Sequence, residues 1–366
     1  MSYRRATKFH RSYSEDISTS DSYENFLDTL YGLPLGSSDA ATFRARPFVV
    51  RRNRDGTLEV CSTDVQALSF ESMCSLRNDP ANRELRHDDI MRALRSPSGF
   101  AVSNVGVSVA LEITIHNRRF AVLVESTPGS AYKLISGYCD IGGAASYNPH
   151  PAAEFLVTAC RELLEELLVC RPSRSQISVI PLQVRSTHPL DEMLPLPAGI
   201  PPHYVQNISI DSTHPPIQVT RGARPAYLAG TFEPSKIIVD GQSLEAAFYL
   251  DRRYRSSQVV FSFTLDLSGS EYTLLHAEDS YCAENRRLET VLHPHGLILA
   301  ELAPNGRLLG DFFRMHEGKL VQRTCPTKIQ LSEIFTTCSG TPGIIEHGAV
   351  SISEYLLNQG RLGGSR

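Results

Sequence analysis

The stretch Cys160 to Val169 reads CRELLEELLV, and its pattern decides which fold the sequence predicts. If these residues form a helix, with about 100° between successive positions, three carboxylates share one arc roughly 100° wide: Glu162, Glu165 and Glu166. Three leucines of the same stretch point to the opposite side. The predicted helix begins near Pro151, because proline suits a first turn, and ends before Pro172, because proline cannot continue a helix.

The acidic side of this helix has two explanations. A charged face in contact with water is the commoner one. However, Glu162 and Glu166 form a like-charge pair four residues apart, which costs about 0.2–0.5 kcal/mol. All three glutamates also lie toward the C-terminus, where the helix dipole favours cations, and only Arg161 offsets their charge locally. Closely grouped carboxylates suit hard cations, so we expect this face to hold Mg²⁺ or Mn²⁺.

Strand patterns precede the helix. The β-branched run 107–115 and the run 120–124 flank a short turn-like segment, which predicts a β-hairpin. A further strand-like run covers 132–141 and ends at Gly142 and Gly143. The predicted order is therefore a hairpin, a strand, a glycine pair, a loop and the acidic helix.

This order resembles that of the Nudix hydrolases, whose signature is G-x5-E-x7-R-E-U-x-E-E-x-G-U, with U a bulky aliphatic residue. Six residues match the second half of the signature in register: Arg161, Glu162, Leu163, Glu165, Glu166 and Val169. Gly142 and Gly143 look like the glycine pair that opens the signature, and the resemblance makes them the candidate cofactor-binding loop. It also implies an α/β fold in which a Nudix-like mixed β-sheet is sandwiched between helices.

The resemblance implies an activity as well. Members of the family use water to cleave the diphosphate bond of a nucleoside-diphosphate-linked small molecule. By this likeness Glu162, Glu165 and Glu166 are metal ligands, the last two also take part in catalysis, and Arg161 holds the loop and the helix in shape through a salt bridge. The metal ion neutralises charge on the phosphoryl oxygens and activates the water.

A reaction of this kind also needs a general base, often a glutamate outside the signature. The segment 276–289 follows a strong strand pattern and offers Glu278, Glu284 and Glu289, of which Glu284 is the catalytic candidate. Acidic residues in such a loop are more commonly only solvated. A base must lie within hydrogen-bond reach of the water, which is a question for the structure.

The match to the signature is incomplete. Gly143 and Arg161 lie 18 positions apart, where the signature needs 14. Ala153 stands where a glutamate is expected, with Glu154 about 100° away around the helix, and Leu168 replaces the late glycine. These departures favour a second hypothesis, a non-catalytic Nudix-like module that binds a nucleotide or a protein partner in a regulatory role. A third is a different metal-dependent carboxylate enzyme whose helix matches by chance.

The chain divides into three predicted regions. Residues 1–22 are polar and predict a disordered tail. Residues 23–104 predict a small N-terminal α+β region, a candidate element for specificity or dimerisation, so a homodimer is one expected assembly. Residues 105–360 predict the Nudix-like domain, in which the proline-rich segment 186–258 is an insertion that forms a hairpin or a loop over the substrate.

Local patterns predict further elements in these regions. In the N-terminal region, a hairpin is expected from 47–52 and 57–61, and a helix from 87–95. Downstream of the acidic helix, strands are expected at 176–185 and 259–267, two strands or a strand and a helix at 287–292 and 296–302, and a last helix at 351–359.

Composition excludes several classes of protein. The 366 residues are 41% hydrophobic, enough for a sizeable core, and the net charge of −4 gives no basic signature of nucleic-acid binding. The sequence has no apolar run of about 18 residues, so we expect no transmembrane helix. The polar N-terminus predicts no signal peptide. The eight cysteines are scattered without a C-x-x-C pair, as in a reduced cytoplasmic protein.

Other motifs carry less weight. His293 and His295 would lie on one face of a strand and could bind a metal, although loop histidines beside prolines are the more ordinary interpretation. The sequence has no G-x-S-x-G motif of a serine hydrolase and no P-loop of a nucleoside triphosphatase.

Overall fold

The computed structural model describes part of the chain, and the structural statements below concern that part alone: residues 34–39, 43–64, 66–77, 79, 86–125, 132–139, 151–171, 177–186, 208–222, 237–251, 256–268, 271–282, 287–293, 295–304, 308–323, 328–329, 343–345 and 350–351. The predicted tail 1–22 and nearly all of the predicted helix 351–359 lie outside these ranges.

The fold is mainly β, and the predicted α/β architecture with a Nudix-like sheet between helices is therefore wrong. Strands make up 60% of the described residues and helices 16%. The three helices of the described part are α2 (Phe70–Arg77), α3 (His87–Arg95) and α4 (Pro151–Glu166). The error arose because the fold class followed from the resemblance of one helix, whereas β-branched and aromatic runs dominate most of the chain.

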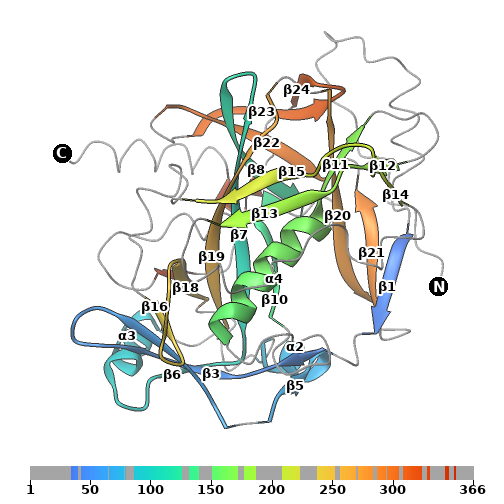
Figure 1. The fold of residues 1–366 in the computed structure, drawn as a ribbon. Helices are drawn as coiled ribbons and strands as arrows, with labels where there is room; N and C mark the ends of the chain where they lie inside the picture. The colour runs from blue at the N-terminus through green and yellow to red at the C-terminus, as the bar shows by residue number, and fades with distance from the viewer. Residues whose placement is uncertain are drawn as a thin grey trace.

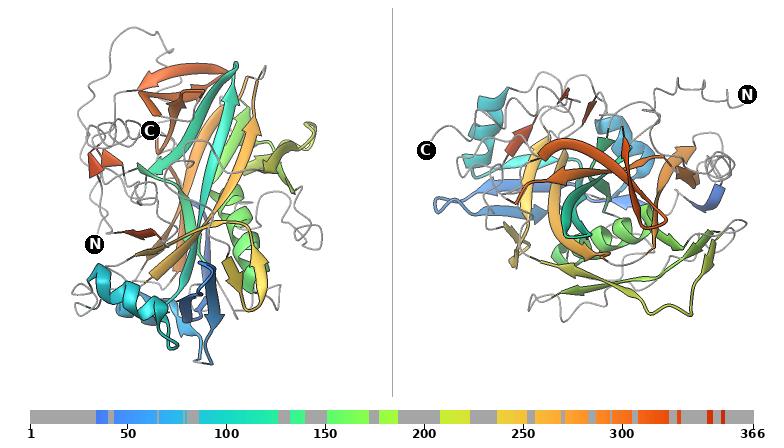
Figure 2. Two further views of the ribbon diagram at one scale, coloured as in Figure 1. Left: turned by 90° about the vertical axis from the view of Figure 1, so that its left-hand side faces the viewer. Right: turned by 90° about the horizontal axis from the view of Figure 1, so that it is seen from above.

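The largest sheet has fourteen strands in the described part and curls into a half-barrel, which is seen from above in Figure 2. Its main path runs in the order β13-β15-β19-β7-β8-β22-β23-β24. The strands on this path are β7 (Val105–Ile115), β8 (Arg118–Glu125), β13 (Leu182–Ser186), β15 (Ile217–Arg221), β19 (Ser256–Asp266), β22 (Leu297–Leu302), β23 (Leu308–His316) and β24 (Lys319–Arg323). Shorter strands join beside it: β9 (Tyr132–Lys133), β10 (Ile135–Tyr138), β18 (Ala247–Asp251), β25 (Lys328–Ile329), β26 (Gly343–Ile345) and β27 (Val350–Ser351).

The predicted hairpin at the centre of this sheet is confirmed. Strands β7 and β8 pair antiparallel, with Ile113 opposite Phe120. His116 and Asn117 form the turn with φ of 50° and 63°, the backbone conformation that a two-residue hairpin turn needs. On its other side β7 pairs in parallel with β19, so β7 is a central strand and is buried along nearly its whole length.

A second sheet has six strands in the order β1-β21-β20-β11-β12-β14. They are β1 (Pro34–Asp39), β11 (Leu167–Arg171), β12 (Ile177–Val179), β14 (Ile208–Ile210), β20 (Thr273–Cys282) and β21 (Arg287–His293). The acidic helix was predicted to continue to just before Pro172, but it ends at Glu166 and passes directly into β11. Residues Leu168 and Cys170 of that strand are buried with Leu275 of β20, and this packing outweighs the helical pattern.

A third sheet joins the N-terminal region to the segment 186–258. Its strands are β17 (Gln242–Leu244), β16 (Ile237–Val239), β4 (Leu58–Ser62), β3 (Phe48–Arg52) and β6 (Phe100–Val102), with a separate pair formed by β2 (Arg44–Ala45) and β5 (Leu68–Ser69). The predicted hairpin β3–β4 is confirmed, and β16 pairs in parallel with β4. The described part of 186–258 thus contributes strands to all three large sheets.

Helix α4 lies at the centre of the molecule, between the largest sheet and the second sheet (Figure 1). Fourteen of its sixteen residues are buried. Phe155, Leu156 and Leu163 belong to the main hydrophobic core, together with side chains of β7 and β19. A charged helix face exposed to water is therefore excluded for α4, because the side of the helix that carries the glutamates also packs against protein.

No helix in the described part is both long and apolar enough to span a membrane.

Candidate metal site at the end of the buried helix

The carboxylates of α4 lie in the interior. Glu165 is 8% exposed and Glu166 is 6% exposed, whereas Glu162 is half-buried. The carboxylate of Glu162 sits directly against Gly137 of β10, where an added Cβ atom would collide with it. Glycine at position 137 is therefore what allows β10 and the end of α4 to approach this closely.

His276 faces Glu166 from the second sheet. Leu167, which follows Glu166, is paired with His276 in the β11–β20 ladder, and this register brings Nε2 of His276 to 3.7 Å from Oε2 of Glu166. His276 is 1% exposed. Neither ring nitrogen of His276 has a hydrogen-bond partner among the described residues, and the same is true of Oε2 of Glu166.

A second histidine–glutamate pair lies beside the first. His293 of β21 is the cross-strand partner of His276, and the two ring centroids are 5.9 Å apart. Nε2 of His293 lies 3.4 Å from Oε2 of Glu278, two residues along β20 from His276. Because side chains alternate along a strand, His276 and Glu278 share the face of β20 that looks toward the end of α4. We call Glu162, Glu165, Glu166, His276, Glu278 and His293 the buried acidic cluster.

Lys133 of β9 borders the buried acidic cluster, and Arg161 of α4 also lowers the pKa values of Glu162 and Glu165 by its charge. Lys133 of β9 donates a hydrogen bond from Nζ to Oγ of Ser136, at 2.9 Å. Its positive charge lowers the pKa values of Glu162, Glu166 and Glu278, although desolvation has the larger and opposite effect on each. Asp279 accepts a hydrogen bond from the Thr290 hydroxyl, and its negative charge further raises the pKa values of Glu162, Glu165 and Glu166.

Burial and mutual repulsion change the protonation of the buried acidic cluster. Desolvation, followed by the charge of Glu166, raises the pKa of Glu162 to about 8. Desolvation raises the pKa of Glu166 to about 7, the pKa of Glu278 to about 8 and the pKa of Glu165 well above its ordinary value. Near neutral pH the carboxylates therefore hold protons that a bound cation would replace.

The histidines respond to burial in the opposite sense. Desolvation lowers the pKa of His276 to about 3 and the pKa of His293 to about 4. Both imidazoles are therefore neutral at physiological pH, which is the form that binds metal ions. Carboxylate oxygens and neutral imidazole nitrogens together are a donor set suited to divalent metals.

The donor atoms are close to one another but do not yet converge on one point. Within the described ranges no three His, Cys, Asp or Glu side chains are already placed to hold a metal ion together. The uncompensated buried atoms of Glu166 and His276 nevertheless fit a cation chemically, since each carries a lone pair with no hydrogen-bond donor within reach. Binding would require side-chain rotations that bring a third donor to this pair.

Arg161 lies outside this group of donors. Its guanidinium is 3.5 Å from the carboxylate of Glu154, one of the most deeply buried acids of the chain. The salt bridge therefore lies within α4 and braces the helix along its length. Glu154 is the residue next to Ala153, where the signature expects a glutamate.

Several predicted site residues are not brought to the cluster. Gly142, Gly143 and Glu284 lie outside the described residues. Glu289 is opposite Ser280 in the β20–β21 ladder, farther along the ribbon than Glu278. The predicted pair of His293 and His295 on one strand face does not form, because β21 ends at His293 and Nδ1 of His295 lies 2.8 Å from the Arg314 guanidinium.

The strand pattern around His276 indicates a polar site. His276 and Glu278 are two residues apart in the run Thr-Leu-Leu-His-Ala-Glu, which begins at Thr273, and their neighbours Leu274, Leu275 and Ala277 are all buried and apolar. Two polar residues on one face of an otherwise apolar strand indicate a polar site inside the protein. Their approach to α4 depends on the pairing of β11 with β20, which no local pattern reveals.

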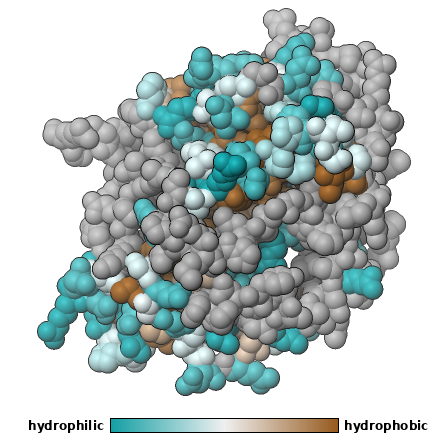
Figure 3. Space-filling model, in the orientation of Figure 1, coloured by the Kyte–Doolittle hydropathy of each residue, from teal (hydrophilic) through white to brown (hydrophobic). Residues whose placement is uncertain are grey.

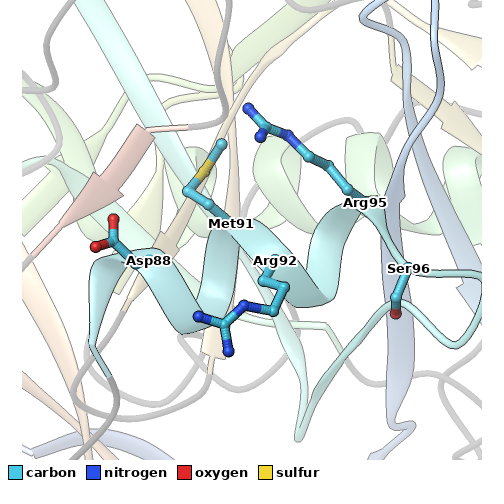
Figure 4. A pocket seen from close by; sticks show the side chains of 5 residues that line it. All are labelled: Asp88, Met91, Arg92, Arg95 and Ser96. Carbon is cyan, nitrogen blue, oxygen red and sulfur yellow. The ribbon is translucent and has the colours of Figure 1, made fainter.

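The remaining surface offers weaker candidates. A hollow on α3 is lined by Asp88, Met91, Arg92, Arg95 and Ser96, with the two arginines pointing in different directions (Figure 4). Arg92 forms an exposed ion pair with Asp89, an ordinary surface arrangement. On the face drawn in Figure 3, hydrophobic side chains lie between hydrophilic ones. The exposed large hydrophobic residues of the described part are scattered over α2, β14 and β23: Leu76, Ile210 and Leu309.

Comparison with known proteins adds no relative. No protein-family model matches the chain, and searches of curated proteins and of solved structures give no significant match. The likeness to the Nudix signature thus rests on the residues of α4 themselves, and the buried acidic cluster must be interpreted from its own geometry.

Proposed function

We propose that the chain is a metal-dependent hydrolase that cleaves the diphosphate bond of a nucleoside-diphosphate-linked compound at the buried acidic cluster. One observation carries the proposal: Glu165 and Glu166 are buried, mutually repelling carboxylates, Glu166 lies 3.7 Å from the neutral imidazole of His276, and no cation of the described chain forms a salt bridge with Glu166. An arrangement of this kind is costly without a counter-charge, and a divalent cation supplies one.

The residues of the cluster divide into roles. Glu162, Glu165 and Glu166 hold the cation, with Mg²⁺ and Mn²⁺ as the candidates. A cation there supplies charge that stabilises the phosphoryl oxygens and activates water. Glu278, whose carboxylate lies 3.4 Å from Nε2 of His293, is our candidate for the base that accepts the proton of the attacking water. It can do so only in its ionised form, which a bound cation nearby would favour. Lys133 offers positive charge to the phosphate groups.

The substrate class has separate support. It follows from the run Arg161-Glu162-x-x-Glu165-Glu166, which is shared with enzymes that cleave diphosphates. The fold adds nothing to this part of the proposal, because the architecture is mainly β. The cluster geometry supports cation binding, and the sequence motif supports a substrate that contains a diphosphate.

A non-catalytic module that binds a nucleotide or a protein partner is the second candidate. Leu168 favours it, because this residue replaces the late glycine of the signature and is fully buried within β11. Ala153 favours it too, since the position holds a buried apolar residue in place of an acid. In that case the cluster would bind a cation or a ligand without turnover.

A hydrolysis assay separates the two candidates. Purified chain is incubated with ADP-ribose and with a panel of nucleoside-diphosphate-linked sugars, with Mg²⁺ or Mn²⁺, and product release is measured by chromatography. We expect turnover by the wild type and at least a ~100-fold loss in Glu165→Gln/Glu166→Gln. Asp89→Asn, which removes an exposed acid from α3, is the control and should keep full activity. Cation binding without turnover on any substrate would favour the non-catalytic module.

A further inference from the structure

We propose that His276 is a metal ligand together with Glu166, and that this mixed oxygen and nitrogen donor set selects Mn²⁺, Fe²⁺ or Zn²⁺ over Mg²⁺. The inference rests on the proposed function, because it uses the same cluster, and it narrows the class of cation. The resemblance to the Nudix signature does not include His276.

The distance between the two donor atoms fits a shared ion better than a direct bond. Nε2 of His276 and Oε2 of Glu166 are 3.7 Å apart, which is longer than a hydrogen bond of about 2.7–3.2 Å. Two ligand atoms that are each about 2.1 Å from one metal ion lie roughly 3.0–3.4 Å apart in octahedral or tetrahedral geometry. A closing movement of a few tenths of an ångström would therefore bring these two atoms to the separation of two ligands of one ion.

Within the described residues, His276 is buried without a hydrogen-bond partner for its lone pair. The side chain is 1% exposed, and its ring nitrogens have no hydrogen-bond partner in the described part of the chain. A buried polar group without a hydrogen-bond partner is unfavourable. A metal ion in front of Nε2 would supply the missing partner.

The backbone around His276 fixes the direction of the ring. An added Cβ at Gly296 would come within 2.7 Å of Nδ1 of His276, so Nδ1 lies against Gly296 while Nε2 is the nitrogen near Glu166. Ligating histidines commonly donate a hydrogen bond from the nitrogen that does not bind the metal; Nδ1 of His276 has no such partner among the described residues, and packing against Gly296 orients the ring instead. Gly296 is therefore a positioning residue, and the space it leaves allows the ring its present orientation.

Further donors are available on both sides of the pair. Glu165 and Glu162 precede Glu166 on the same end of α4, and Glu278 lies two residues from His276 on the same strand face. A set of carboxylates alone suits Mg²⁺, whereas an imidazole suits transition metals such as Zn²⁺ and Fe²⁺ and is tolerated by Mn²⁺. The presence of His276 therefore decides the class of metal.

Pulsed electron paramagnetic resonance of the Mn²⁺-loaded full chain tests the ligand directly. The wild type should show ¹⁴N modulation from a directly bound imidazole, which changes to the ¹⁵N pattern when the histidines are labelled. His276→Gln should abolish the modulation and weaken Mn²⁺ binding by about 10- to 100-fold. In the wild type, Mg²⁺ should bind at least tenfold more weakly than Mn²⁺ in calorimetry.

Two glycine variants keep the test independent of the folding of His276→Gln. Gly296→Ala presses on Nδ1 of the His276 ring and on Cβ of His293, another residue of the cluster, and should weaken Mn²⁺ binding, whereas Gly222→Ala, which meets nothing within 4 Å, should leave it unchanged. Mn²⁺ bound without nitrogen modulation, or modulation retained in His276→Gln, would overturn the ligand assignment and leave the hydrolase proposal standing. Nitrogen modulation without turnover of any diphosphate would confirm the ligand and count against the hydrolase.

Discussion

Oε2 of Glu166 lies 3.7 Å from Nε2 of His276, although the two residues are far apart in the sequence. They meet because α4 ends at Glu166 and continues as β11, whose first residue pairs with His276 of β20. The junction of α4 and β11 therefore places the acidic end of the helix beside the strand that carries His276.

Replacing Glu166 with glutamine should stabilise the metal-free chain. The variant removes one of several buried, mutually repelling carboxylates, and the raised pKa of Glu166, about 7, measures the cost of its charge. At pH 8 we expect the free energy of unfolding in urea to rise by about 1–3 kcal/mol. Asp89→Asn, an exposed acid on α3, should change it by less than about 0.5 kcal/mol. A loss of stability in Glu166→Gln would mean that the carboxylate already has a compensating partner.

The stability of the metal-free chain should fall as the pH rises from 6.5 to 8.5. The pKa of Glu162 and of Glu278 is about 8 in the folded chain and that of Glu166 is about 7, all above the ordinary 4.5. The folded state therefore binds more protons than the unfolded state over this window, and stability decreases as those protons leave.

The two buried histidines do not alter this result. Their lowered pKa values, about 3 for His276 and about 4 for His293, increase stability with pH only up to about 6.5. Thermal unfolding in the presence of a chelator should show a fall in Tm of the order of 5 °C or more between pH 6.5 and 8.5. Saturating Mn²⁺ should abolish the fall, and a Tm that rises with pH in the chelator would contradict the burial of these acids.

Metal binding should release protons. Because Glu162, with a pKa of about 8, is largely protonated near pH 7 and Glu166, with a pKa of about 7, is partly protonated, a cation must displace protons, and its affinity should increase from pH 6 to pH 8. Calorimetry of Mn²⁺ binding in buffers of different ionisation enthalpy should give about one proton or more released per ion. An affinity independent of pH would place the ion away from these carboxylates.

Gly137→Ala should weaken metal binding more than it affects folding. The new Cβ would strike the carboxylate of Glu162, which is the end of a flexible side chain and can move away. We expect a tenfold or greater loss in Mn²⁺ affinity with a change in Tm of only a few degrees. Gly222→Ala, in open space, is the matched control. Unchanged affinity in Gly137→Ala would remove Glu162 from the site.

Local pattern predicted the local structure well. The hairpins β7–β8 and β3–β4, helix α3 and the start of α4 at Pro151 all follow from turn residues, alternation and first-turn preferences. The fold class did not follow, because it depends on pairings between distant segments. The parallel pairing of β7 with β19 and of β4 with β16 has no signal in either strand alone.

In the candidate site, too, local pattern predicted one part and the pairing of distant strands determined the other. The carboxylates of α4 were found from their spacing, which places them on one arc of a helix. The register of β11, β20 and β21 brings His276, Glu278 and His293 to them. The sequence offered Glu278 as one of three candidate bases and His293 as a possible metal ligand beside His295, but it did not place either residue beside α4. The helix also ends earlier than its pattern predicted, since burial of Leu168 against β20 favours a strand.

Calorimetry of Mn²⁺ binding at pH 8 is the most direct test of the central claim, that the end of α4 holds a divalent cation. The experiment compares the wild type, Glu165→Gln/Glu166→Gln and the control Asp89→Asn. We predict one ion per chain in the wild type and the control, and a loss of binding in the double variant with the fold intact. A folded wild type that binds no Mn²⁺, or a double variant that binds it equally well, would contradict the account.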